Sequence, residues 1–195
     1  MIKFILPLFV CCSLHAQIVL DGATIRGATI GTTNATGGGA GPNAWFDSVL
    51  TTDGNVDTAG PNFMEWIDVV VSQGGTATKL RWKYNNSSSP NDEPIKIAIY
   101  NSTGTTLLGQ GVGVVPFGLS TDTYIEVTLS ASFFISAGTY RIAQATNPST
   151  GTLKASTQSG ANGPYKSQAY SGFPPASLGT EDGHLNQWLA GVFVQ

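Results

Sequence analysis

Apolar residues alternate with polar ones in short runs between Glu93 and Thr146. The runs are Ile95, Ile97 and Ile99, then Val112 and Val114, then Ile125, Val127 and Leu129, then Tyr140 and Ile142. Clusters of Gly, Ser, Thr and Asn separate them. Alternation with period two, broken by turn-forming residues at short intervals, is typical of half-buried antiparallel strands. The segment therefore predicts part of a β-sheet.

The same pattern continues on both sides of this segment. We expect strands over residues 63–72, 77–84, 94–101, 105–115, 123–130, 138–146, 152–158, 164–170 and 186–194. No stretch of ten or more residues has a convincing helical periodicity. This number and spacing of strands predicts an all-β fold, a two-layer antiparallel β-sandwich.

The strand around Trp82 shows how its two faces divide. Leu80, Trp82 and Tyr84 alternate with Lys79, Arg81 and Lys83, which are all basic. Because successive side chains of a strand point to opposite faces, Leu80 and Trp82 should enter the core. The basic residues then form either a solvated stripe that discourages aggregation or a platform for an acidic glycan.

Composition fits a β-rich protein that works outside cells. Only 11% of the 195 residues are charged, and 24 are glycine. The formal net charge of −3 is too small to steer the protein towards DNA or an anionic membrane. We therefore expect no nucleic-acid partner.

Residues 1–16 have the features of a secretory signal peptide. Lys3 is followed by an apolar run that is too short to span a bilayer, and Ala16 offers a small residue for cleavage. The residues before Cys11 and Cys12 disfavour lipoprotein processing. We expect a secreted mature chain, extracellular or periplasmic, with no cysteine and no transmembrane segment, whose stability comes from its core.

Residues 17–43 form a leader or linker rich in Gly, Ala and Thr. Gly-Ala-Thr-Ile occurs at Gly22–Ile25 and again at Gly27–Ile30, but a solenoid or fibre needs more repeats than two. We expect an extended, flexible segment before the sandwich of residues 44–195. Alternatively, residues 17–36 pair as a strand with a neighbouring copy and support self-assembly.

Three motifs resemble jelly-roll modules of secreted bacterial and phage surface proteins, including carbohydrate-binding modules. They are Ile97–Asn101 with the following Gly104 and Leu107, the strand Tyr124–Leu129, and the turn Ile135–Tyr140. The resemblance covers residues 63–194, and the loop Tyr170–Pro174 is also similar to one in that group. It implies a jelly-roll-like sandwich that acts in carbohydrate binding or adhesion. It does not identify a ligand.

Catalytic chemistry finds little support in the sequence. His184 is the one histidine of the mature chain, it lies in a polar loop, and no Gly-x-Ser-x-Gly motif is present. No pair of carboxylates has a spacing that argues for glycoside hydrolysis. The stretch Gly109–Gly113 lies within a strand pattern without a following helix, so we do not expect it to bind phosphate. A hydrolase remains an alternative function.

Calcium is the ion that the sequence best accommodates. Asp53, Asn55 and Asp57 carry oxygen ligands at alternate positions, which a tight loop could direct towards one hard cation. Their spacing differs from that of an EF-hand, and they are equally typical of ordinary turns. No cofactor is required, and Ca²⁺ would be structural.

Sugar binding requires flat aromatic rings beside amide and hydroxyl groups. Most aromatic residues of the strands belong to the core, so the candidates are those in loop-like contexts: Trp45, Tyr165, Tyr170 and Phe173. We therefore expect a non-catalytic module that binds carbohydrate or another cell-surface polymer through its loops or one sheet face. The alternative is a structural subunit of a filament, surface layer or virion.

Overall fold

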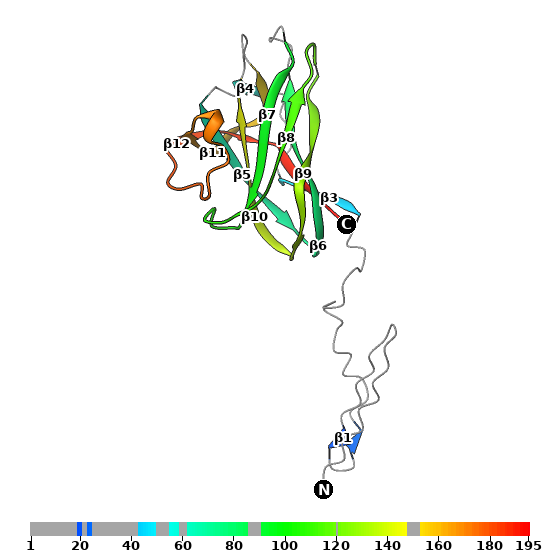
Figure 1. Ribbon diagram of the computed structural model, residues 1–195. Coiled ribbons are helices and arrows are strands. Elements are labelled where there is room, and N and C mark those ends of the chain that lie inside the picture. Colours follow the sequence, from blue (N-terminus) through cyan, green and yellow to red (C-terminus); the bar gives the residue numbers. More distant parts are fainter. Residues whose placement is uncertain are drawn as a thin grey trace. The chain divides into compact units, whose positions relative to one another are not determined.

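The computed structural model describes residues 19–20, 23–24, 43–49, 55–58, 62–85, 91–119, 121–147 and 153–195 (Figure 1). The chain divides into two compact units, residues 1–39 and 40–195. In the first unit, β1 (Val19–Leu20) pairs antiparallel with β2 (Ala23–Thr24). The expected signal peptide and most of the expected leader lie outside the described residues. No helix of the described part is long and apolar enough to cross a membrane.

The second unit is a sandwich of two antiparallel sheets. One sheet has the order β3-β13-β6-β9 and the other β5-β10-β7-β8. Numbered along the chain, these eight strands run 1-8-3-6 and 2-7-4-5, which is the jelly-roll arrangement. The predicted all-β jelly-roll-like sandwich is therefore confirmed. The strands are β3 (Ala44–Asp47), β5 (Phe63–Val71), β6 (Gly75–Asn85), β7 (Glu93–Tyr100), β8 (Leu107–Val115), β9 (Thr123–Ile135), β10 (Gly138–Thr146) and β13 (Ala190–Val194).

Three further strands extend the sandwich at one edge. The long strand β11 (Lys154–Ser167) pairs with β5 through one end and with β6 through the other. The strands β4 (Asn55–Thr58) and β12 (Gly183–Trp188) also pair with β11. Thus β11 connects the two sheets, through β5 at the edge of one and through the end of β6, an inner strand of the other (Figure 1).

The prediction was wrong about the region that contains β11. The ranges 152–158 and 164–170 were expected to be two strands. They belong to one strand instead, and the irregularity appears as a register shift between Gln158 and Gly163 in its ladder with β12. The chain then enters the short 3-10 helix η1 (Tyr170–Gly172).

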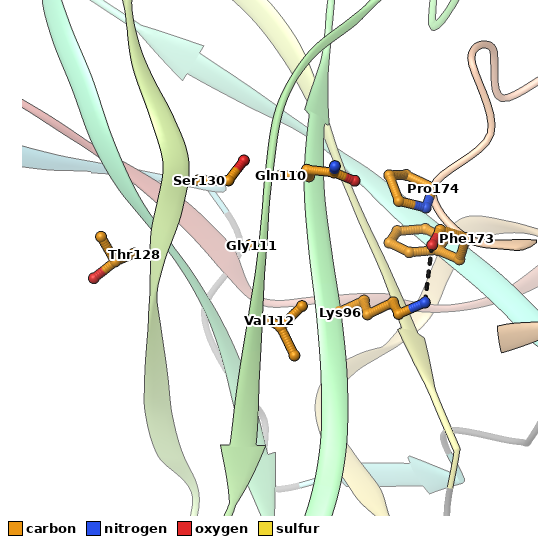
Figure 2. Close-up of a pocket in the computed structure, with 8 residues that line it drawn as sticks. All are labelled: Lys96, Gln110, Gly111, Val112, Thr128, Ser130, Phe173 and Pro174. Carbon is orange, nitrogen blue, oxygen red and sulfur yellow. Dashed lines mark hydrogen bonds between the residues drawn. The ribbon is translucent and has the colours of Figure 1, made fainter. Parts of the chain in front are cut away.

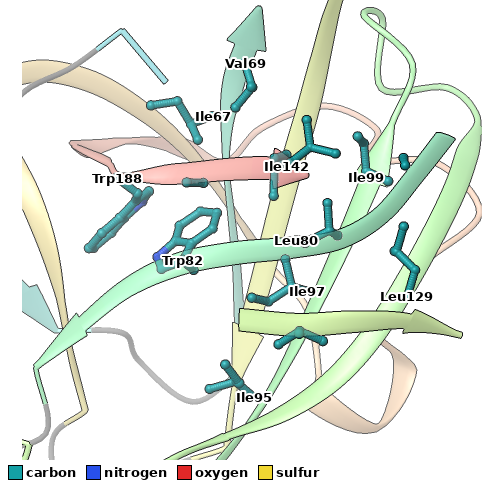
Figure 3. Close-up of a cluster of buried hydrophobic side chains, with 14 of the residues drawn as sticks. Ile67, Val69, Leu80, Trp82, Ile95, Ile97, Ile99, Leu129, Ile142 and Trp188 are labelled. Atoms are coloured by element: carbon teal, nitrogen blue, oxygen red, sulfur yellow. The ribbon is translucent and has the colours of Figure 1, made fainter. Parts of the chain in front are cut away.

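The main hydrophobic core lies between the sheets (Figure 3). As predicted, Leu80 and Trp82 are fully buried there, and the ring centroids of Trp82 and Trp188 lie 6.4 Å apart. Tyr84 also points inward, where its hydroxyl donates a 2.7 Å hydrogen bond to Gln144 Oε1. Gln144 Nε2 in turn donates to Glu65, so these buried polar groups have partners. Burial raises the pKa of Tyr84, with a smaller contribution from the charge of Glu65.

The edge strands β8 and β9 meet on the side opposite β11. A Cβ atom at Gly111 would collide with the main-chain oxygen of Thr128 and would lie 2.5 Å from Val127 Cγ1. Only glycine therefore permits this close approach. The stretch Gly109–Gly113 is part of β8, as the sequence predicted, and its glycines allow the two strands to close the sandwich.

A second, smaller core lies on the outer face of the sheet that contains β5, β10 and β7. Side chains of these strands contact Phe173 and Leu178 from the loop of residues 168–182, which we call the cover loop. Tyr170 and Leu107 pack at the margin of this core. The cover loop is thus a packed element of the fold, held by its own apolar contacts.

Candidate functional site

A groove crosses the outer face of β8 (Figure 2). Its volume is about 430 Å³, within the range of about 300–1,000 Å³ that is usual for small-molecule sites. The floor comes from β8, one wall from β9 and the other from the cover loop together with a side chain of β7. The lining residues are Lys96, Gln110, Gly111, Val112, Thr128, Ser130, Phe173 and Pro174.

The cover-loop wall consists of the rings of Phe173 and Pro174 (Figure 2). The peptide bond between them is cis. Tyr100 fixes the following residue, because its hydroxyl donates a 2.8 Å hydrogen bond to Pro175 O. Further along, Leu178 N donates to Gly104 O at 2.8 Å. The segment that follows the apolar wall is therefore anchored to β7 and to the loop between β7 and β8.

Lys96 is the main polar contact between the sheet and the cover loop. Its Nζ donates hydrogen bonds to Tyr170 O at 2.9 Å and to Phe173 O at 3.1 Å. The same Nζ lies 4.4 Å from the centroid of the Tyr170 ring, a cation–π distance. These contacts place a positive charge at the base of the Phe173 wall.

The opposite wall and the floor supply hydroxyl and amide groups. Thr128 and Ser130 come from β9, and Gln110 comes from the outer face of β8. The ladder between β9 and β6 is irregular here: Thr128 pairs with Lys79, whereas the next pair joins Phe133 to Ala77. Ser130 thus lies where β9 leaves its regular pairing, and its hydroxyl is turned towards the groove (Figure 2).

The groove combines two apolar rings with an amide, the hydroxyl of Ser130 and an ammonium group, whereas the Thr128 side chain is directed away from Gln110 (Figure 2). Carbohydrate sites use such a mixture, because a sugar presents an apolar ring face and many hydroxyl groups. The side chains that line the groove include no carboxylate, thiol or imidazole.

The predicted ligand-binding residues do not form one cluster. Phe173 lines the groove, although its side chain is only 4% exposed because it also belongs to the outer core. Tyr170 lies behind this wall, against Lys96, and burial raises its pKa. Tyr165 lies in β11, where its ring packs edge-on against Phe63 with centroids 5.6 Å apart.

Trp45 lies on the other sheet, in a compact cluster around Arg81. The Arg81 Cζ atom is 4.2 Å from the ring centroids of both Trp45 and Tyr124, and the guanidinium group is paired with Asp47. The Trp45 ring also packs against Phe193 at 5.3 Å. One ring face of Trp45 is therefore covered by protein groups. We call these residues the Arg81 cluster.

The candidate calcium ligands lie in and next to β4. Asp53 is outside the described residues, while Asn55 and Asp57 are in β4, which pairs with β11. The side chains of Asn55 and Asp57 are, like Asp53, outside the described part of the chain. In the described part of the chain, no group of three or more His, Cys, Asp or Glu side chains could hold a metal ion.

The acidic loop before β12 forms ordinary local contacts. His184 Nε2 lies 3.2 Å from Glu181 Oε1, and both side chains are largely exposed. Asp182 Oδ2 accepts a 2.7 Å hydrogen bond from Ser167 N, and this bond lowers the pKa of Asp182. Asp182 thereby caps the end of β11 and fixes the start of the cover loop.

Sequence reasoning missed the four groove residues with polar side chains: Lys96, Gln110, Thr128 and Ser130. Each occupies an outward position of an alternating strand, and the sequence alone predicts only that such a position is exposed to solvent. No local motif marks them, because they meet only through the packing of β8 against β9 and through the cover loop. No protein-family model matches the chain, and a search of curated proteins finds no similar sequence.

Proposed function

We propose that this protein is a secreted, non-catalytic module that binds carbohydrate in the groove over β8. The groove itself carries this proposal, because it places an apolar wall, Phe173 and Pro174, opposite amide and hydroxyl side chains. A sugar ring would pack against the partly exposed ring of Pro174, which the buried Phe173 supports, and exchange hydrogen bonds with Gln110 and Ser130. The expected signal peptide supports a role outside the cell.

An array of plant, algal and bacterial polysaccharides would test this function with the purified mature chain. We expect enrichment on at least one polysaccharide. The double variant Gln110→Ala/Ser130→Ala should weaken binding about tenfold or more, because two hydrogen bonds are lost. The matched control is Val114→Ala, which removes an outward side chain of the same strand that does not line the groove.

Two results would count against carbohydrate binding. The first is no enrichment on any polysaccharide. The second is unchanged affinity in the double variant, measured by isothermal titration with the best ligand of the array. Urea unfolding of both variants would show that they keep the wild-type fold.

Self-assembly is a second candidate function, favoured by an exposed apolar strip along β8. Val112, Val114 and Phe117 are 68%, 50% and 63% exposed, and the sequence of β8 contains no charged residue. Edge regions of soluble sheets usually carry charges that prevent association. Sedimentation of the mature chain and of a chain that lacks residues 17–41 would test this idea. A monomer at all concentrations in both would exclude it.

A further inference from the structure

The charge of Lys96 has no acidic partner among the described residues. Its contacts are two main-chain carbonyl oxygens and the ring of Tyr170, which are all uncharged. Other cations of the sandwich do pair with acids, as Lys79 does with Glu126 and Arg141 with Asp68. Lys96 is only partly exposed, so bulk solvent screens its charge less than that of a free surface lysine.

The groove is therefore locally positive in a protein whose net charge is negative. Lys96 is the one charged residue among those that line it, while the whole chain carries a formal charge of −3. A positive site with no acidic neighbour attracts anions and gives no advantage to neutral ligands. The Lys96 ammonium group thus adds a preference for anionic over neutral ligands. The uncharged groups of the groove do not supply such a preference.

We propose that the saccharide bound in the groove is anionic and that its carboxylate or sulfate group lies near the ammonium group of Lys96. This inference rests on the proposed carbohydrate-binding function and specifies its ligand class. The apolar wall would hold the sugar ring, Gln110 and Ser130 would contact its hydroxyls, and Lys96 would select the charge. A contact between an ammonium and a carboxylate or sulfate is stronger than a hydrogen bond between neutral groups.

Matched pairs of probes separate the effect of charge from that of shape. The first pair is an oligogalacturonate and the same oligosaccharide after chemical reduction of its carboxyl groups to alcohols. The second pair is a sulfated galactan oligosaccharide and its desulfated form. For the wild-type mature chain at low salt, isothermal titration should show about tenfold tighter binding of the charged member of one pair.

Salt and one substitution identify the source of the preference. In 0.5 M NaCl the two members should bind about equally, because salt screens the charge. Lys96→Met should also remove the preference at low salt, whereas Lys79→Met, on the other sheet, should retain it. The salt experiment uses the wild-type protein, so it shows whether the preference is electrostatic even if Lys96→Met disturbs the cover loop.

The outcomes distinguish this inference from the function on which it rests. If charged and neutral members bind equally at low salt, the anionic preference is wrong and carbohydrate binding stands. If the preference survives in a folded Lys96→Met variant, Lys96 does not select the charge. If no member of either pair binds but other polysaccharides do, the ligand class is wrong. If nothing binds, the proposed function fails as well.

Discussion

The outer faces of the two sheets each carry a cation stacked on aromatic rings, but the two clusters differ in charge balance. Arg81 lies between Trp45 and Tyr124 and is paired with Asp47. Lys96 lies against Tyr170 and is held by carbonyl oxygens alone. In the first cluster the Arg81 charge is paired with a carboxylate, whereas the second keeps the Lys96 charge, which has no acidic partner among the described residues, beside an open groove. Similar residue types thus form a charge-paired cluster on one face, whereas on the other they leave the Lys96 charge without an acidic partner among the described residues.

The largest expected difference between the two faces is in how far Gly111 and Gly191 tolerate substitution. Gly111→Ala places a Cβ against the main chain of β9, so the strands must separate, and we expect a loss of about 3 kcal/mol in the free energy of unfolding. Gly191→Ala meets mainly the tip of the Asp47 side chain, which can rotate away, at a cost of about 1 kcal/mol. Urea unfolding measures both. Equal losses would show that the two faces are equally rigid.

The two lysines should also differ in their effect on stability. Lys96→Met removes two hydrogen bonds from a charged donor to the cover loop, and we expect a loss of about 2 kcal/mol. Lys79→Met breaks only an exposed ion pair and should change stability by less than about 0.5 kcal/mol. Hydrogen exchange should show faster exchange in residues 168–182 of the first variant alone. Unchanged exchange there would mean that apolar packing suffices to hold the cover loop.

The smallest expected effect concerns the tyrosine of each cluster. Burial raises the pKa of both Tyr124 and Tyr170, but only Tyr124 is also raised by a nearby carboxylate, that of Asp47. Asp47→Asn removes this negative charge, so the pKa of Tyr124 should fall while that of Tyr170 stays constant. NMR titration of the tyrosine ring carbons would measure both. A shift at Tyr170 would show that the two faces are electrostatically coupled.

The sequence predicted the sandwich well because its strands follow simple alternation. The inward side of β6, with Leu80 and Trp82, and the inward isoleucines of β7 are examples. The strand β11 was predicted less well, since Gly160, Gly163 and Pro164 have turn propensity that the ladder with β12 overrides. Local preference is decisive only where no neighbouring strand competes with it.

The groove could not be predicted in the same way. Phe173 was identified as a candidate because it lies in a loop rich in aromatic residues, and it does line the groove. Its partners Gln110 and Ser130 come from two strands whose contact depends on Gly111. The contact between β8 and β9 joins the edges of different sheets, so the spacing of residues along the chain cannot predict it.

The position of β13 bears on how the protein is synthesised. This strand lies between β3 and β6. The first strand of the sandwich, β3, is therefore joined to the rest of its sheet through β13, the last strand. Until the ribosome has released Ala190–Val194, β3 has no partner in that sheet among the described strands, and most of one edge of β6 lacks its hydrogen-bonded neighbour. We therefore expect the domain to fold only after translation of β13, and a chain truncated at residue 189 to be a substrate for chaperones and proteases.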